Sequence, residues 1–293
     1  MGLPVCERLV AAGWDVAAAD ARPEVEAAVR AAGARWAPDA AALVDQVDVV
    51  VTVLPGTAEL QAVMAEAMAR LRPGMAWIDM TSGDPRRAQA LVREAALRGV
   101  QALDAALGGG VPAARSGTVQ LFVGAEADAV ERHRPLLEVV GRIEHVGGPG
   151  AGRLMKLIVN LLWFGQSLAV GEALLVARRS GLDLGVVSEV LGRSAAASEF
   201  IARDLPGLLA GDYRDAFGLD RCCDQIDAMS DLARELGVPF ELSDAVRSAY
   251  RAALKRYGPV DGELRAVALL EERAGIALRD GGAPAPADHP SPT

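Results

Sequence analysis

Lysine is scarce in this chain. Only two of its 30 basic residues are lysines, Lys156 and Lys255, and the others are arginines. No block of basic residues occurs and the net charge is −9, which argues against nucleic acid as a partner. The three cysteines and three histidines show no metal-ligand spacing. We therefore expect no metal site and no disulfide framework.

A targeting segment is also lacking. The N-terminus, MGLPVCERLVAAGWDV, has neither the basic start nor the apolar block of a signal peptide. Together with the low cysteine content, this predicts a soluble protein of the reducing cytoplasm. Cys222 and Cys223 are adjacent, and adjacent cysteines rarely reach disulfide geometry, so we expect them to serve packing rather than redox chemistry.

What the chain does have is one long apolar stretch, from Gly147 to Gly181. Its glycine-rich entry, about thirty residues without proline and a final glycine predict one long helix. About 20 apolar residues would suffice to cross a bilayer. Lys156 and Glu172 would be costly in lipid, so we expect a soluble core helix and no membrane partner.

Lys156 is the residue of interest on this helix. Burial can lower the pKa of an ammonium group until it exchanges protons near neutrality, whereas arginine stays charged. Asn160 follows at i+4 and therefore faces the same way. Lys156 could instead reach the surface, with Asn160 capping a neighbouring loop. The spacing alone leaves a catalytic and a structural interpretation open.

Strands alternate with helices in the first half of the chain. Apolar runs predict strands at Val47–Leu54, Met75–Met80, Gln101–Asp104 and Val119–Val123, with helical segments between them. This alternation predicts an α/β fold with a Rossmann-like, doubly wound parallel sheet over residues 1–147.

The second half shows no convincing strand. Its pattern predicts an all-helical C-terminal domain over residues 148–279, entered through the long helix between the two domains. The final stretch, 280–293, is rich in proline and alanine and is expected to be disordered.

The beginning of the first domain departs from the pattern of dinucleotide-binding domains. Such a domain opens with a strand, a G-x-G-x-x-G turn and a helix. Here residues 3–12 are already helical, and Gly2 stands where the third glycine would be. We therefore expect that the first strand and two glycines are missing and that the true start codon lies upstream.

Asp20 ends the next extended run, at about the separation from the glycine turn where an acid binds the ribose 2′-hydroxyl. This favours NAD, although Arg22 leaves room for the 2′-phosphate of NADP. Taken alone, Asp20 would also fit a simple turn.

Four motifs occur in order along the chain. They are Met1–Pro4 as the end of a glycine-rich turn, VTVLPG at 51–56 with IDMTSGDP at 78–85, DAALGGGVPAARSGTVQLFVG at 104–124, and GAGRLMKLIVN at 150–160. In this order they resemble the 3-hydroxyisobutyrate dehydrogenase family, also called the β-hydroxyacid dehydrogenases. The fourth motif matches the family pattern G-x-G-x-x-x-K-x-x-x-N at every fixed position.

The resemblance implies an NAD(P)-dependent oxidoreductase that acts on a small 3-hydroxyacid or the matching semialdehyde. It implies Lys156 as the general acid/base and Asn160 as the residue that orients substrate and lysine. The remaining implied residues are Gly108, Gly109 and Gly110 for the substrate carboxylate, and Gly2, Asp20, Leu54, Pro55 and Ser82 along the cofactor.

The chain departs from the family at further positions. Gly108 replaces a serine, and a lysine–aspartate pair on a late helix aligns with Asp224 and Gln225. With fewer polar groups in the site, reduction of an imine or a less polar carbonyl is an alternative. A non-catalytic relative that has lost cofactor binding is another: the missing turn favours it, whereas the intact motif at 150–160 favours an enzyme.

The apolar helix and the helical second half would expose much apolar surface on a monomer. We therefore expect a homodimer or a larger homo-oligomer. The segments 243–256 and 263–278 are candidate contact surfaces. The remaining expected partner is the small-molecule substrate.

Overall fold

The computed structural model describes residues 1–279 of the chain, which divide into two compact units. The first unit is Met1–Leu157 and the second starts at Ile158, so the division falls within one helix, α8 (Ala151–Arg179). The stretch 280–293, for which we expect disorder, lies outside the described residues.

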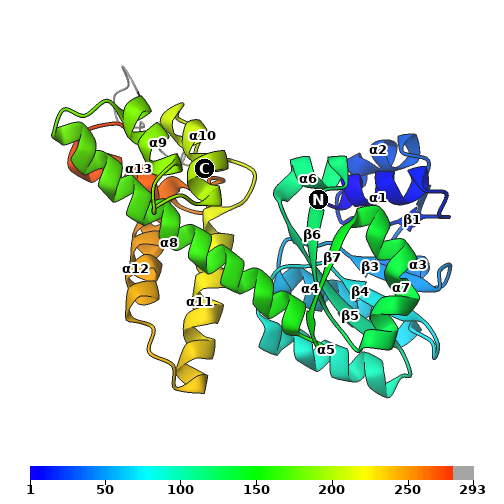
Figure 1. The fold of residues 1–293 in the computed structure, drawn as a ribbon. Helices are drawn as coiled ribbons and strands as arrows, with labels where there is room; N and C mark the ends of the chain where they lie inside the picture. Colours follow the sequence, from blue (N-terminus) through cyan, green and yellow to red (C-terminus); the bar gives the residue numbers. More distant parts are fainter. Residues whose placement is uncertain (280–293) are drawn as a thin grey trace, which may run out of the picture. The chain divides into compact units, whose positions relative to one another are not determined.

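The first unit alternates strands and helices (Figure 1). Its elements are α1 (Gly2–Ala11), β1 (Ala17–Ala18), the 3₁₀ turn η1 (Pro23–Val25), α2 (Glu26–Ala31), β2 (Arg35–Trp36), α3 (Ala40–Val44), β3 (Val49–Thr52), α4 (Thr57–Ala67), the 3₁₀ turn η2 (Met68–Arg70), β4 (Ala76–Asp79), α5 (Pro85–Leu97), β5 (Gln101–Gly108), α6 (Gly110–Ser116), β6 (Val119–Gly124), α7 (Ala127–Val140) and β7 (Gly141–Gly147).

The strands form two sheets. Five of them follow the order β3-β4-β5-β6-β7, while β1 and β2 pair with each other in a second sheet. Neighbouring strands run parallel except β5 and β6, which are antiparallel. The predicted α/β fold with a largely parallel sheet is thus confirmed, and β6 and β7 run in the direction opposite to β3, β4 and β5. Among the described residues no strand precedes α1.

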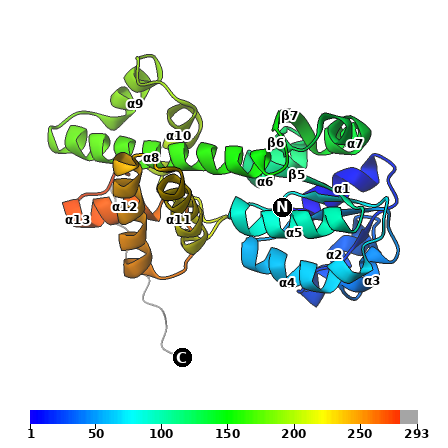
Figure 2. The ribbon, with the colours of Figure 1, turned by 90° about the horizontal axis from the view of Figure 1, so that it is seen from below.

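Helices cover both faces of the larger sheet, as the doubly wound pattern predicts (Figures 1 and 2). On one face α1, α6 and α7 enclose a core that includes Ile78, Leu103 and Leu121. On the other face α3, α4 and α5 enclose a core around Trp77. All four residues of β4 are buried, as expected for a central strand.

Several elements of the first unit have weak sequence signals and are absent from the sequence-based prediction. Strand β7 reads GRIEHVG, so polar residues and terminal glycines interrupt any apolar run. Helix α7 contains Pro135, which disfavours a helical assignment. Helix α6 contains Pro112 and follows glycines, and β2 is only two residues long.

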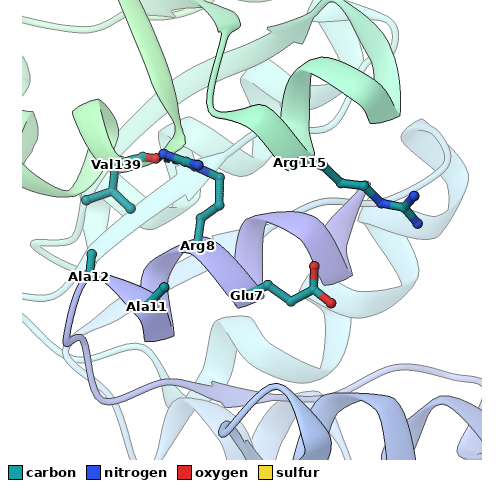
Figure 3. A pocket seen from close by; sticks show the side chains of 6 residues that line it. All are labelled: Glu7, Arg8, Ala11, Ala12, Arg115 and Val139. Atoms are coloured by element: carbon teal, nitrogen blue, oxygen red, sulfur yellow. Dashed lines mark hydrogen bonds between the residues drawn. The ribbon is translucent and has the colours of Figure 1, made fainter.

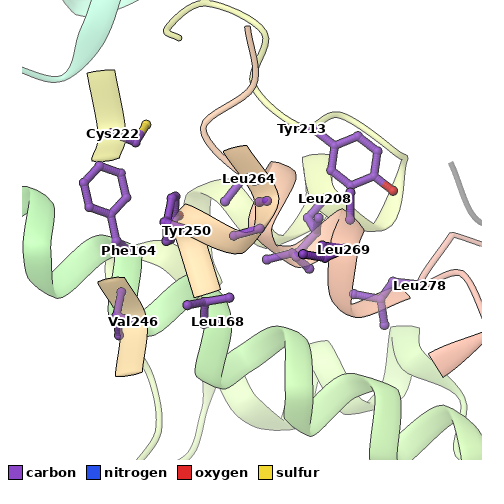
Figure 4. Close-up of a cluster of buried hydrophobic side chains, with 14 of the residues drawn as sticks. Phe164, Leu168, Leu208, Tyr213, Cys222, Val246, Tyr250, Leu264, Leu269 and Leu278 are labelled. Carbon is purple, nitrogen blue, oxygen red and sulfur yellow. The ribbon is translucent and has the colours of Figure 1, made fainter. Parts of the chain in front are cut away.

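The described part of the second unit is helical apart from an isolated bridge between Gly218 and Asp261. After α8 come α9 (Leu184–Gly192), the π-helical turn η3 (Phe200–Asp204), α10 (Leu205–Leu209), α11 (Leu219–Leu236), α12 (Glu241–Tyr257) and α13 (Arg265–Ala274). In the core, the rings of Phe164 on α8 and Tyr250 on α12 lie 4.9 Å apart between centroids (Figure 4).

Helix α8 is long and apolar enough to cross a membrane, judged by length and composition alone. Its side chains Leu157, Phe164, Leu168 and Leu174 are buried in the protein. In its most apolar 18-residue window 33% is buried, and Leu162 and Val176 on the same helix are exposed, so only part of its apolar surface packs against the protein.

Candidate functional site

The loops that follow β3 and β4 lie side by side. The Leu54 amide donates a hydrogen bond to Thr81 Oγ1 (3.2 Å), and the Asp84 amide donates to Thr57 Oγ1 (2.9 Å). These bonds bring together the stretches that carry Leu54 and Pro55 on one loop and Ser82 on the other. A ligand of a parallel α/β sheet binds at this carboxyl end of the strands.

Helix α1 starts next to the same edge. A Cβ added to Gly2 would lie 3.8 Å from Val53 Cβ, at the end of β3. No side chain of the described residues caps the start of α1, so its first N–H groups can meet an anion. This arrangement fits the pyrophosphate of a dinucleotide.

Asp20 follows β1 and is paired with Arg22. Arg22 donates to both carboxylate oxygens, from Nε (3.1 Å) and Nη2 (3.1 Å), and its backbone N–H also donates to Oδ1 (2.9 Å). The bond from the Arg22 side chain lowers the pKa of Asp20. Burial, and then the charges of Arg22 and Arg115, lower the pKa of the Met1 amino group. The acid expected to bind the ribose and a cation suited to a 2′-phosphate thus lie together near the start of α1.

The predicted carboxylate-binding glycines form the turn between β5 and α6. Gly109 and Gly110 have φ values of 102° and 74°, in the left-handed region that residues with a side chain rarely adopt. A Cβ on Gly108 would lie 3.1 Å from Phe122 Cε2. The Phe122 ring therefore fills the space beside Gly108 into which a serine side chain would extend.

Two glycines shape the start of α8. Gly150 has a φ of 94°, and a Cβ on Gly152 would lie 2.1 Å from the Phe122 carbonyl oxygen. The first glycine of the GAG motif thus permits a left-handed turn, and the second permits close packing of the helix against β6.

The carboxylate of Asp104, on β5, accepts hydrogen bonds from backbone N–H groups at the start of α8. Its Oδ1 accepts from the Gly150 amide (2.6 Å) and its Oδ2 from the Arg153 amide (2.7 Å). Burial raises the pKa of Asp104 to about 6, although these hydrogen bonds favour the charged form. The side chain holds α8 to the sheet.

Arg153 adds a second attachment. Its Nη2 donates to Asp79 Oδ2, and both side chains are buried. Asp79 Oδ1 also accepts from Thr52 Oγ1 (2.7 Å) and from the Thr81 amide (3.0 Å). Asp79, Asp104 and Arg153 are not among the site residues predicted from the sequence. The sequence did contain a signal for them, because each of two adjoining apolar strands includes one aspartate. A buried aspartate needs a hydrogen-bond donor or a cation as its partner.

Lys156 lies one turn beyond Arg153 on α8 and is half-buried. Asn160, the next predicted residue, belongs to the second unit and donates from Nδ2 to Gln225 Oε1 (2.6 Å). Gln225 is buried on α11, and its neighbour Asp224 is exposed. Gln225, one of the two residues for which the resemblance implies a lysine–aspartate pair, therefore contacts the predicted Asn160.

The other unusual side chains of α11 are Cys222 and Cys223. Both are free and buried, and burial raises the pKa of each thiol. Among the described residues, no cluster of histidine, cysteine, aspartate or glutamate could hold a metal ion.

A groove of about 460 Å³ lies elsewhere in the first unit, along α1 (Figure 3). It is lined by Glu7, Arg8, Ala11, Ala12, Arg115 and Val139. Arg8 Nε donates to the Val139 carbonyl (2.7 Å), which joins α1 to α7 at the groove. None of the predicted site residues lines it.

Two family models match the chain. The model described as the NAD binding domain of 6-phosphogluconate dehydrogenase matches residues 1–148. The model described as NAD-binding of NADP-dependent 3-hydroxyisobutyrate dehydrogenase matches residues 150–270.

Curated proteins are similar over most of the chain. L-threonate dehydrogenase of Cupriavidus necator is 31% identical over 258 residues, which cover 86% of this chain and 87% of that protein. The 3-hydroxyisobutyrate dehydrogenase of Pseudomonas aeruginosa is 33% identical over 199 residues, 67% of each chain.

Solved structures share the fold. Mycobacterium tuberculosis 3-hydroxyisobutyrate dehydrogenase with L-serine aligns with a TM-score of 0.83 at 24% identity, covering 92% of this chain and 95% of that one. The imine reductase of Myxococcus stipitatus in complex with NADP+ aligns with a TM-score of 0.62 at 20% identity, covering 92% and 96%.

Proposed function

Since the chain belongs to the 3-hydroxyisobutyrate dehydrogenase family of NAD(P)-dependent oxidoreductases, we propose that it acts on a small 3-hydroxyacid or the matching semialdehyde, with Lys156 as the general acid/base. The observation that carries this proposal is the placement of Lys156. It follows a helix start that two buried carboxylates attach to the sheet.

The cofactor is NAD or NADP, which when bound exchanges a hydride with the substrate carbon. The start of α1 at Gly2 would hold the pyrophosphate, and Asp20 or Arg22 the adenosine ribose. Leu54, Pro55 and Ser82, on the adjoining loops, would line the cofactor.

Lys156 Nζ would accept the proton of the substrate hydroxyl during oxidation and return it to the carbonyl oxygen during reduction. Asn160 would orient the substrate, and its hydrogen bond to Gln225 supports this role because it fixes the amide. The amides of Gly108, Gly109 and Gly110 would bind the substrate carboxylate, since backbone without side chains can approach an anion closely.

We also propose that the protein is a cytoplasmic homo-oligomer without a membrane or nucleic-acid partner. Val176 on α8 and Val186 and Val190 on α9 are exposed. Burial of these residues against a second copy would remove apolar surface from water. The three free cysteines are compatible with a reducing compartment.

Replacement of Lys156 tests the central proposal. Oxidation of 3-hydroxyisobutyrate, L-serine and L-threonate would be followed with NAD+ and NADP+ by absorbance of the reduced cofactor. We expect Lys156→Ala to lower kcat by about 10²–10⁴-fold, while the affinity for NADH is kept. Lys255→Ala, which removes the other lysine, is the control and should change nothing. Full activity of the Lys156 variant would exclude the proposed proton transfer.

Imine reduction is the second candidate, and Gly108 is the observation that favours it. The serine expected here is absent and Phe122 fills the space, so the site offers one hydroxyl fewer to a carboxylate. A cyclic imine such as 1-pyrroline, tested with NADPH, separates the candidates. A kcat/KM above that of every hydroxyacid would favour the imine.

A further inference from the structure

We propose that Arg153 is the positioning residue for Lys156, held by its side chain on Asp79 and by its backbone on Asp104. The inference rests on the role proposed for Lys156. The buried Arg153 side chain would not touch the substrate, but it would determine where the proton-transferring amine of Lys156 lies.

The two carboxylates are neighbours in the sheet. Asp79 on β4 and Asp104 on β5 occupy the same register position of adjoining parallel strands, and each is 2% exposed. Two buried carboxylates at this spacing repel each other unless a cation or hydrogen-bond donors face them. Arg153 supplies a donor to each, the guanidinium to Asp79 and the backbone N–H to Asp104.

These two attachments determine how the first turn of α8 is rotated. The backbone bond lies near the helix axis, whereas the guanidinium bond lies at the end of a long side chain. A helix held at both points cannot rotate about its axis without breaking one bond. Lys156 is three residues further on, about 4.5 Å along the axis and on an adjoining position of the same face. A small rotation of the turn would therefore displace the Lys156 amine.

Asp79, which accepts the hydrogen bond from the Arg153 guanidinium, is itself held in place. Asp79 accepts from Thr52 Oγ1, and Thr52 Oγ1 accepts from Trp77 Nε1 at 3.0 Å. Thr52 lies at the end of the edge strand β3 and Trp77 on the neighbouring strand β4, so both partners belong to the sheet and hold the carboxylate when the helix moves. Arg153 is thus bound to a rigid point of the sheet.

The ion pair has little value as a stability element alone. Removing two charges from water costs about as much as their attraction returns, and replacing such pairs by apolar residues is often neutral or stabilising. Arg153 also has a buried Nη1 with no hydrogen-bond partner among the described residues. A site selected for stability alone would favour an apolar residue here, whereas a site selected for geometry would retain the planar guanidinium.

The scarcity of lysine gives a direct test. Chain labelled with ¹⁵N at lysine side chains has two such signals, from Lys156 and Lys255, and Lys255→Arg assigns them. In the double variant Arg153→Met with Asp79→Asn both charges are removed, so no buried charge is left unpaired. We expect the Lys156 signal to shift or broaden and the exposed Lys255 signal to stay in place.

Kinetics with 3-hydroxyisobutyrate and NAD+ complete the test. We expect the double variant to unfold at a urea concentration close to that of the unmodified chain. Its kcat should fall about 100-fold because the amine is misplaced, with KM changed less than twofold. Unchanged kcat and an unmoved Lys156 signal in the folded variant would overturn the proposal. If the double variant does not fold, Arg153→Lys replaces it: loss of kcat with retained fold supports positioning, and full kcat refutes it.

A further comparison separates this inference from the proposed function. If Lys156→Ala keeps full activity, the proposed function fails, whatever the Arg153 variants do. If Lys156→Ala is impaired, adding the Arg153 and Asp79 replacements should lower kcat no further, because both changes act on one group. An additive loss would show that Arg153 acts by another route.

Discussion

Gly124 on β6 and Gly152 on α8 are in backbone contact: a Cβ on Gly124 would lie 2.6 Å from the Gly152 amide nitrogen. The same Cβ would lie 2.7 Å from Asp104 Oδ1. Two elements can approach this closely only where neither has a side chain. The glycine pair therefore sets the distance at which Asp104 can bind the amides at the start of α8.

Gly152→Ala should destabilise the first unit. The new methyl group would meet the Phe122 carbonyl at 2.1 Å, so the helix start must move away from the sheet. Such overpacking costs about 1–3 kcal/mol, measurable as a lower urea midpoint. Gly148→Ala is the matched control, because a Cβ there meets nothing within 4 Å. Equal midpoints for the two variants would contradict the close contact.

Asp104 should make stability depend on pH. Burial raises its pKa from 3.8 to about 6, so the folded chain binds this proton more tightly than the unfolded chain. The protonated side chain therefore contributes its full stabilisation below about pH 4. The free energy of unfolding then falls by about 3 kcal/mol as the pH rises from about 4 to about 6, and this group causes no further change above that pH. Asp104→Asn removes this titration. Urea unfolding of both chains between pH 4 and 7 should show the fall in the unmodified chain alone. The same slope in both would exclude Asp104 as its source.

The GAG motif shows how far the sequence could predict this region. Its spacing predicted the start of α8 and placed Lys156 and Asn160 on one face. It did not reveal the partner of Asp104, because residues 46 to 49 positions apart meet only after the sheet has formed. Arg153 occupies a position that the family motif leaves unspecified, so no pattern identified it.

Strand direction was also beyond the reach of sequence patterns. The run Val119–Val123 predicted a strand, but the alternation of apolar residues is the same in either direction. The short helix α6 returns the chain so that β6 runs antiparallel to β5. The whole connection between β5 and β6 is 109–118, ten residues, which is fewer than the dozen or more that a parallel crossover needs. Loop length could therefore have given the direction once α6 was recognised.

The Asp20–Arg22 pair should decide cofactor preference. Asp20→Ala removes the group that accepts a hydrogen bond from the ribose, so it should weaken the binding of NADH more than that of NADPH. Arg22→Ala should weaken the binding of NADPH more than that of NADH. A hydrogen bond to a charged group is worth about 1.5–3 kcal/mol, or about 10–100-fold in Kd. Fluorescence titration measures both constants. Arg30→Ala breaks another exposed ion pair, with Glu26, and serves as the control. If each of the three variants changed the Kd of both cofactors equally, the Asp20–Arg22 pair would not determine cofactor preference.

Val176→Asp should reduce self-association. Val176 is 67% exposed on α8, and a carboxylate there would have to be desolvated in an interface. We expect a lower molar mass by light scattering at micromolar concentration. Leu97→Asp is the control, since Leu97 is 90% exposed on the first unit. An unchanged mass for Val176→Asp would place the interface elsewhere.

The hydrogen bonds from α8 to Asp104 also determine where mobile anions can go. The opening amides of α8 are occupied by a carboxylate of the chain itself, whereas no side chain of the described residues caps α1. We therefore expect inorganic phosphate or sulfate in a buffer to bind at the start of α1 rather than at the start of α8, the helix that carries Lys156. Such salts should act as competitors of the dinucleotide and leave proton transfer untouched.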